Sequence, residues 1–178
     1  SGWHTLVDGL SNIWGLAVCP NGNVYWAERT DIVVNVLECA DDVVPTNGVC
    51  YSYASTLSTF YDIGNDGFGG MPYHVACGVD NDVAVSTVSS GGVGGNIHYY
   101  NSQTDQWMLL QDADVSAHTV GLSFTPAGDL RVIADIDSDS DSDGVNHYRL
   151  FLVECQELEP YSPHHGPACA WFGDNRTD

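Results

Sequence analysis

The chain has 178 residues and a formal net charge of −20, with 24 aspartate and glutamate residues, four arginines and no lysine. This charge repels phosphate backbones and anionic lipid surfaces, which excludes nucleic acid and membranes as partners. Apolar residues make up 43% of the chain, enough for a folded core, and no apolar run approaches the roughly 20 residues of a membrane helix. The composition therefore indicates a folded, acidic protein without a membrane-spanning helix.

A strand–turn–strand pattern occurs three times along the chain. It begins at residue 15 (GLAVCPNGNVYW), has a weaker copy at residue 75 (VACGVDNDVAV) and returns at residue 121 (GLSFTPAGDLRV). The Pro-x-Gly and Asp-Asn-Asp segments supply turn residues, and β-branched and aromatic residues flank them. Each copy therefore predicts a β-hairpin.

Further strands follow each hairpin. Residues 36–39 align with 152–155, and in the middle copy residues 96–110 form a second strand–turn–strand. Helical periodicity is nearly absent, so we assign an all-β fold. The chain is expected to form one domain over 1–178 from three four-stranded antiparallel repeats, which span residues 13–62, 71–112 and 118–173.

These segments resemble known repeats. Residues 15–28 resemble the inner hairpin of NHL-repeat and gluconolactonase-like six-bladed β-propellers, and residues 96–110 are similar to the outer hairpin of kelch-type blades. The resemblance implies a propeller-like fold, which hosts many unrelated functions. Three blades are fewer than the four to eight of a closed ring. We therefore expect a homo-oligomer or larger assembly, in which strand 3–7 completes a blade. A β-trefoil or β-prism is the alternative fold.

Six cysteines in a glycine-rich chain of this size indicate an oxidising compartment. They allow 15 pairings, and no C-x-x-C occurs, so we expect structural disulfides and not a zinc site. Two pairs each bracket a short loop with proline and glycine, and the third follows by elimination. The expected disulfides are Cys39–Cys50, Cys155–Cys169 and Cys19–Cys77. A glycosylation sequon at Asn175 and the start without methionine also suit a mature, secreted glycoprotein.

The densest acidic segment is DIDSDSDSDG at residues 135–144. Alternating aspartates place several carboxylates within reach of one ion, and hard oxygen ligands favour Ca²⁺. The segment matches the first half of an EF-hand loop, but Leu150 stands where that loop has its final glutamate. It is more similar to the calcium loops of integrin-type propellers and thrombospondin repeats. We expect Ca²⁺ to be held by Asp137, Asp139, Asp141 and Asp143. The alternative is a solvated acidic loop.

A second candidate site follows from the propeller resemblance, which gathers several acidic loops on one face. Glu28, His74, His118 and Asp135 fall near the expected central funnel, with both histidines at comparable points of their first strands. They are expected to line a polar pocket or to hold a second metal. The alternative is hydrogen-bonded loop histidines. No nucleophile elbow, catalytic cysteine or phosphate-binding loop occurs, so no catalytic residue is assigned.

The leading functional hypothesis is a secreted, non-enzymatic, calcium-binding module. It would bind a glycan or an identical subunit in an extracellular assembly such as a matrix. The acidity also suits a saline environment, where ions screen self-repulsion. The alternative is a metal-dependent lactonase or esterase of gluconolactonase type, in which a central Ca²⁺ would activate a carbonyl. The resemblance implies Glu28, Asp135 and His74 as its candidate ligands.

Overall fold

A computed structural model describes residues 5–40, 50–65, 70–88, 95–110, 118–135, 148–155 and 169–173. Within these residues the regular structure is three four-stranded antiparallel sheets and one short 3-10 helix. The prediction of an all-β fold built from three four-stranded antiparallel repeats is therefore confirmed. In the described residues, no helix has the length and apolar character needed to span a membrane.

Each sheet is formed by four strands that are consecutive in the chain. The first sheet contains β1 (Ile13–Val18), β2 (Val24–Glu28), β3 (Val33–Leu37) and β4 (Ser58–Asp62), and the 3-10 helix Ile63–Asn65 follows it. The second contains β5 (Met71–Cys77), β6 (Val83–Val88), β7 (Ile97–Asn101) and β8 (Gln106–Leu110). The third contains β9 (His118–Phe124), β10 (Leu130–Asp135), β11 (Tyr148–Cys155) and β12 (Cys169–Gly173).

The first hairpin of each sheet has the same local geometry. Its turn contains one residue with positive φ, namely Gly22 (85°), Asn81 (68°) or Gly128 (94°). Glycine and asparagine adopt this left-handed conformation at little cost, which explains their place in the sequence pattern. A β-bulge also interrupts the register near the start of each hairpin. Turn and bulge together define equivalent positions in the three sheets.

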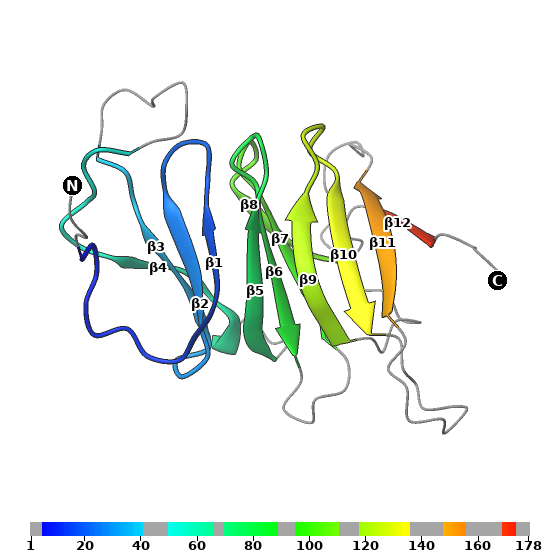
Figure 1. Cartoon of the computed structure of the whole chain (residues 1–178), viewed down its shortest axis with the longest axis horizontal. Coiled ribbons are helices and arrows are strands. Elements are labelled where there is room, and N and C mark those ends of the chain that lie inside the picture. The colour runs from blue at the N-terminus through cyan, green and yellow to red at the C-terminus, as the bar shows by residue number, and fades with distance from the viewer. Residues whose placement is uncertain are drawn as a thin grey trace.

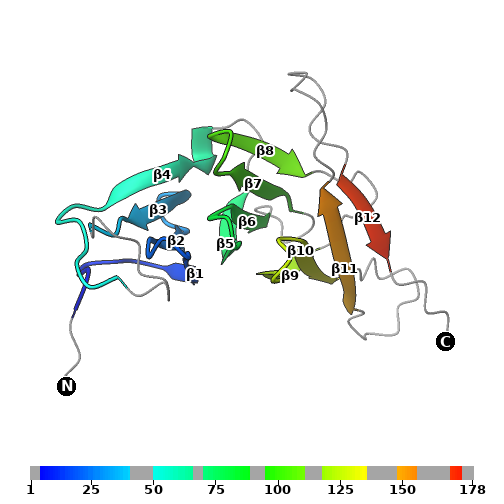
Figure 2. The same ribbon diagram turned by 90° about the horizontal axis from the view of Figure 1, so that it is seen from above.

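The three sheets lie side by side in an arc (Figures 1 and 2). Strands β1, β5 and β9 line its inner side, and β4, β8 and β12 lie outermost (Figure 2). One face of each sheet packs against the opposite face of the next. The core between the first two sheets contains Tyr25, Ala27 and Val34 from one side and Val75 and Val85 from the other. The chain thus forms three consecutive sheets that pack face to face.

Two of the expected disulfides are present. Cys19–Cys77 joins the first two sheets with a Cα–Cα distance of 5.3 Å, and Cys39–Cys50 closes a loop after β3 with 5.8 Å. Cys155 in β11 lies directly opposite Cys169 in β12, in a register that suits the third pair, which stays a prediction.

The N-terminal strand was expected at residues 3–7. Thr5, Leu6 and Val7 belong to no strand, and residues 3 and 4 lie outside the described part of the chain. Val7 nevertheless packs on the first sheet, against Val24, Trp26 and Leu37. The completion of a blade by this segment stays a prediction.

Candidate functional site

Glu28 ends β2 and is 9% exposed. Ser11 Oγ donates a hydrogen bond to its Oε1 at 3.0 Å, and Asn35 Nδ2 donates to its Oε2 at 2.9 Å. Strand alternation places Glu28 on the same face as Trp26, which points away from the second sheet. Both carboxylate oxygens therefore bond within the first sheet, where they tie the segment before β1 to β2 and β3.

An aromatic and cationic cluster lies beside Glu28, at the junction of the first two sheets. The guanidinium of Arg29 lies 4.5 Å from the ring centroid of Trp14, and its Nη2 donates to the sulfur of Met71 at 3.2 Å. Trp14 also packs against Tyr73, with ring centroids 4.8 Å apart. Sequence analysis gave Arg29 no role. Extending the alignment of the first two repeats by two residues toward the N-terminus pairs Trp14 with Tyr73, and this aromatic pair is the signal that was missed.

The remaining pocket candidates lie in two other sheets. His74 is the fourth residue of β5, and its backbone N–H donates to Ser86 Oγ at 3.2 Å. His118 begins β9 and lies directly opposite Asp135, the last residue of β10. The expectation that both histidines occupy comparable points of their strands is wrong, because the bulge lies before His74 and after His118. The register thus makes neighbours of His118 and Asp135 and places Glu28 and His74 elsewhere.

The predicted calcium ligands Asp137, Asp139, Asp141 and Asp143 lie outside the described residues, as does Asn175. The segment that contains the four aspartates lies between β10 and β11 in the chain, and β10 ends at the same edge of the sheets as β2. In the described ranges, no group of three or more histidine, cysteine or acidic side chains is close enough to hold a metal. Both metal sites therefore stay predictions.

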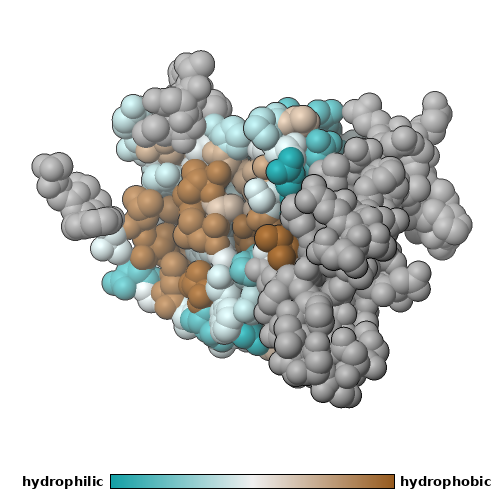
Figure 3. Space-filling model, turned by 45° about the vertical axis from the view of Figure 1, so that its right-hand side comes forward, coloured by the Kyte–Doolittle hydropathy of each residue, from teal (hydrophilic) through white to brown (hydrophobic). Residues whose placement is uncertain are grey.

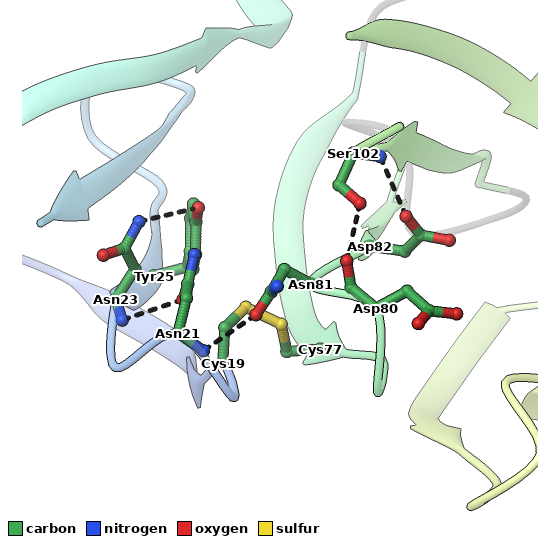
Figure 4. Close-up of a disulfide and its surroundings, with 9 residues drawn as sticks. All are labelled: Cys19, Asn21, Asn23, Tyr25, Cys77, Asp80, Asn81, Asp82 and Ser102. Carbon is green, nitrogen blue, oxygen red and sulfur yellow. Dashed lines mark hydrogen bonds between the residues drawn. A yellow bond between two sulfur atoms is a disulfide. The ribbon is translucent and has the colours of Figure 1, made fainter. Parts of the chain in front are cut away.

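The opposite edge of the sheets uses its polar side chains to close turns (Figure 4). Asn81 Oδ1 accepts a hydrogen bond from the backbone N–H of Asn21 at 2.8 Å, beside the Cys19–Cys77 disulfide. Asp82 Oδ1 likewise accepts from the backbone N–H of Ser102 at 2.8 Å. Part of the negative charge of the chain is thus structural, because these side chains satisfy backbone donors.

Three tyrosines near this edge have raised pKa values. Burial, together with the hydrogen bond to Asp82 and its charge, raises the pKa of Tyr99 well above its ordinary value. Burial and the hydrogen bond to Asp105 raise the pKa of Tyr100 to about 12. Burial also raises the pKa of Tyr25. These phenols stay protonated at physiological pH, and Tyr99 and Tyr100 therefore serve as hydrogen-bond donors to carboxylates.

Among the described residues, an exposed apolar surface lies at each end of the arc, although Val7 and Tyr53 cover Val24, Trp26 and Leu37 on the first sheet. On the first sheet, Leu16 is 61% and Val18 is 53% exposed. Their equivalents in the second sheet, Val75 and Cys77, pack against the preceding sheet. Figure 3 shows apolar side chains gathered on the inner-strand side of the molecule. Ile133 of β10, 44% exposed, belongs to the open face at the other end.

Neither a known protein family nor a curated protein matches this sequence. Among solved structures, a luciferin-regenerating enzyme matches with a TM-score of 0.54 at 15% identity. The match covers 86% of this chain and 48% of the enzyme chain. Regucalcin, a calcium-binding protein from Agrobacterium tumefaciens strain C58, has a TM-score of 0.48 at 12% identity, with coverages of 75% and 41%. A PQQ-bound aldose sugar dehydrogenase from Streptomyces coelicolor has a TM-score of 0.48 at 13% identity. That match covers 85% of this chain and 59% of the dehydrogenase chain.

The chain thus spans about half the length of the solved structures it matches. At these identities the likeness is one of fold. The likeness to the luciferin-regenerating enzyme supports the propeller-like class and leaves the activity of this chain to be argued from its own residues.

Proposed function

We propose that the chain is a secreted, calcium-dependent binding module of propeller-like fold and not a hydrolase. The observation that carries this proposal is the engagement of Glu28, whose two oxygens accept hydrogen bonds from Ser11 and Asn35. The lactonase hypothesis needs Glu28 as a ligand of a central ion. Turning the carboxylate away from these partners toward a central ion would leave a buried Asn35 amide without its acceptor, which costs about 1–3 kcal/mol. Glu28 is therefore better explained as a structural residue.

Two further observations support a secreted binding role. The two disulfides suit an oxidising compartment. The segment from Asp137 to Asp143 offers four alternating carboxylates between β10 and β11, and Ca²⁺ binding there would neutralise part of their charge. Extracellular calcium modules bind with dissociation constants on the order of 10⁻⁴–10⁻³ M, and we expect the same range here.

The partner that the described surface fits best is a neutral glycan, bound at the Trp14–Arg29–Tyr73 cluster. Trp14 is 45% exposed, and its indole ring offers an apolar surface to a sugar. The neighbouring Arg29 guanidinium can donate hydrogen bonds to sugar hydroxyl groups. A glycan array would test this assignment. Retention of neutral oligosaccharides by the native chain and not by Trp14→Ala would support it, and equal retention would contradict it.

A calcium titration of thermal stability tests the module itself. We expect Ca²⁺ to raise the Tm of the native chain at millimolar concentrations, and Asp141→Asn to abolish this rise. Glu28→Gln is the matched control, since it should lower the Tm without changing the calcium response. The same samples are assayed with lactone and ester substrates. Turnover that requires Ca²⁺ and disappears in Glu28→Gln would establish the hydrolase instead, and an unchanged Tm in the native chain would overturn the calcium site.

A further inference from the structure

Neighbouring sheets contact each other through their inner strands, and the first such contact, between β1 and β5, is very close. A Cβ atom added to Gly15 would lie 2.7 Å from the backbone nitrogen of Val75 and 2.8 Å from Cα of His74. Such distances do not occur for real side chains, so glycine is required where the next inner strand approaches. The partner surface on β5 contributes Val75, which is 8% exposed.

The two junctions between neighbouring sheets use the same pair of positions in different ways. Cys19 follows β1 and bonds to Cys77 at the end of β5. At the second junction the equivalent residues are Gly78 and Phe124, and a Cβ at Gly78 would lie 3.1 Å from the Phe124 ring. In both cases a residue at the end of one inner strand meets the last residue of the next inner strand. The contact is therefore directional, with a distinct front and back on every sheet.

One half of this contact remains open at each end of the arc. Gly121 in β9 is equivalent to Gly15, since each is the first residue after its bulge. Among the described residues, however, a Cβ at Gly121 would meet only Ile133, at the ordinary distance of 3.8 Å. At the other end, Leu16 and Val18 stand where Val75 and Cys77 contact a preceding sheet. The chain thus exposes both halves of the contact. Gly121 leaves room for another inner strand, and the apolar strand β1 can pack on another sheet.

We propose that the occupant of both faces is a second copy of this chain, so that two copies close head to tail into one ring. Strand β1 of each copy would pack over Gly121 of the other. Because both halves of the contact belong to one chain, two copies would cover the exposed β1 strand and Gly121 of each other in two identical contacts. The length agrees, since one chain covers 48% of the luciferin-regenerating enzyme. This inference rests on the fold and is independent of the proposed function.

Sedimentation equilibrium of the purified chain at increasing protein concentration tests the ring. The native chain should reach twice the monomer mass and no more. Association should strengthen with salt, because each copy carries a charge of −20. Leu16→Asp and Gly121→Val should each weaken dimerisation at least 100-fold while the circular dichroism spectrum is retained. Leu57→Asp, at an apolar residue 43% exposed just before the outer strand β4, is the matched control and should stay dimeric.

Mixing the two variants distinguishes head-to-tail closure from other dimers. A pair of Leu16→Asp and Gly121→Val chains places both defects in one contact and leaves the other contact intact. Equimolar mixing should therefore restore a heterodimer that neither variant forms alone, whereas a variant that had merely unfolded would not be rescued. A native chain that stays monomeric at every concentration, or a native dimer that Gly121→Val leaves unchanged, would overturn the proposal. In the first case the open faces would belong to other polypeptide segments.

Discussion

The two junctions between neighbouring sheets hold together by different chemistry. The first has the Cys19–Cys77 disulfide, the hydrogen bond between Asn21 and Asn81, and the close backbone approach at Gly15. The second relies on Phe124, which packs on Gly78 and lies near Tyr99, with ring centroids 6.1 Å apart.

Equivalent positions of one repeat therefore carry a covalent bond at one junction and an aromatic contact at the other. The repeat determines where sheets meet, and individual residues determine how strongly they are joined.

Removal of the inter-sheet disulfide is expected to have the largest effect. Its cysteines are 58 residues apart, so the Cys19→Ala, Cys77→Ala double variant should lose about 4 kcal/mol of unfolding free energy, because the crosslink limits the entropy of the unfolded chain. The control pair Cys39→Ala, Cys50→Ala spans 11 residues and should lose less, about 3 kcal/mol. Urea denaturation measures both. A larger loss in the control pair would contradict the comparison.

The two equivalent glycines should differ sharply on substitution. Gly15→Val forces a side chain into the β5 backbone and should cost about 3 kcal/mol of stability, as strong overpacking does. Gly121→Val meets only an ordinary contact with Ile133 among the described residues and should change stability by no more than about 0.5 kcal/mol. Thermal denaturation at a dilution that keeps the chain monomeric gives both values. Equal losses would show that the two strands are not equivalent.

The second junction is tested by Phe124→Ala. Its ring is half-buried between Gly78 and Tyr99, so we expect a loss of about 2 kcal/mol, below the range for fully buried phenylalanine. Hydrogen exchange should show faster opening of β9 and β10, while β1 and β2 keep their protection. Phe124→Leu is the conservative control and should lose about half as much. Uniform acceleration over all three sheets would mean that the junctions do not open separately.

Alkaline pH should lower the unfolding free energy least among these tests, through Tyr100 in the second sheet. The folded pKa of Tyr100 is raised from 10 to about 12. Below pH 10 the phenol is neutral in both states, so its contribution to stability is fully present. Above pH 10 the unfolded chain deprotonates first, and stability falls until about pH 12. Unfolding free energies measured from pH 9 to 12 should decline less steeply in Tyr100→Phe, and an unchanged slope would contradict the raised pKa.

Much of the fold could be predicted because its signals are local. Turn residues at Pro20–Gly22 and Pro126–Gly128 lie between β-branched strands, and repetition of that pattern gave the four-stranded repeats. Cys39 and Cys50 bracket a short loop, so their pairing followed from spacing. The site was less accessible. His74 and His118 each lie near the start of a first strand, but the register shows that His74 corresponds to Gly121 and His118 to Met71.

The sequence by itself determined the all-β repeats, two disulfides and the strongly acidic character, because these depend on residue type and short spacing. The tertiary structure alone decided what Glu28 and Arg29 contact, because their neighbours come from segments that only packing brings together. It also decided which glycine is enclosed. Gly15 and Gly121 begin nearly identical sequence motifs, yet one lies against a neighbouring strand and the other faces an open end of the arc. Their surroundings in the described structure differ, although the chemistry of the motif is the same.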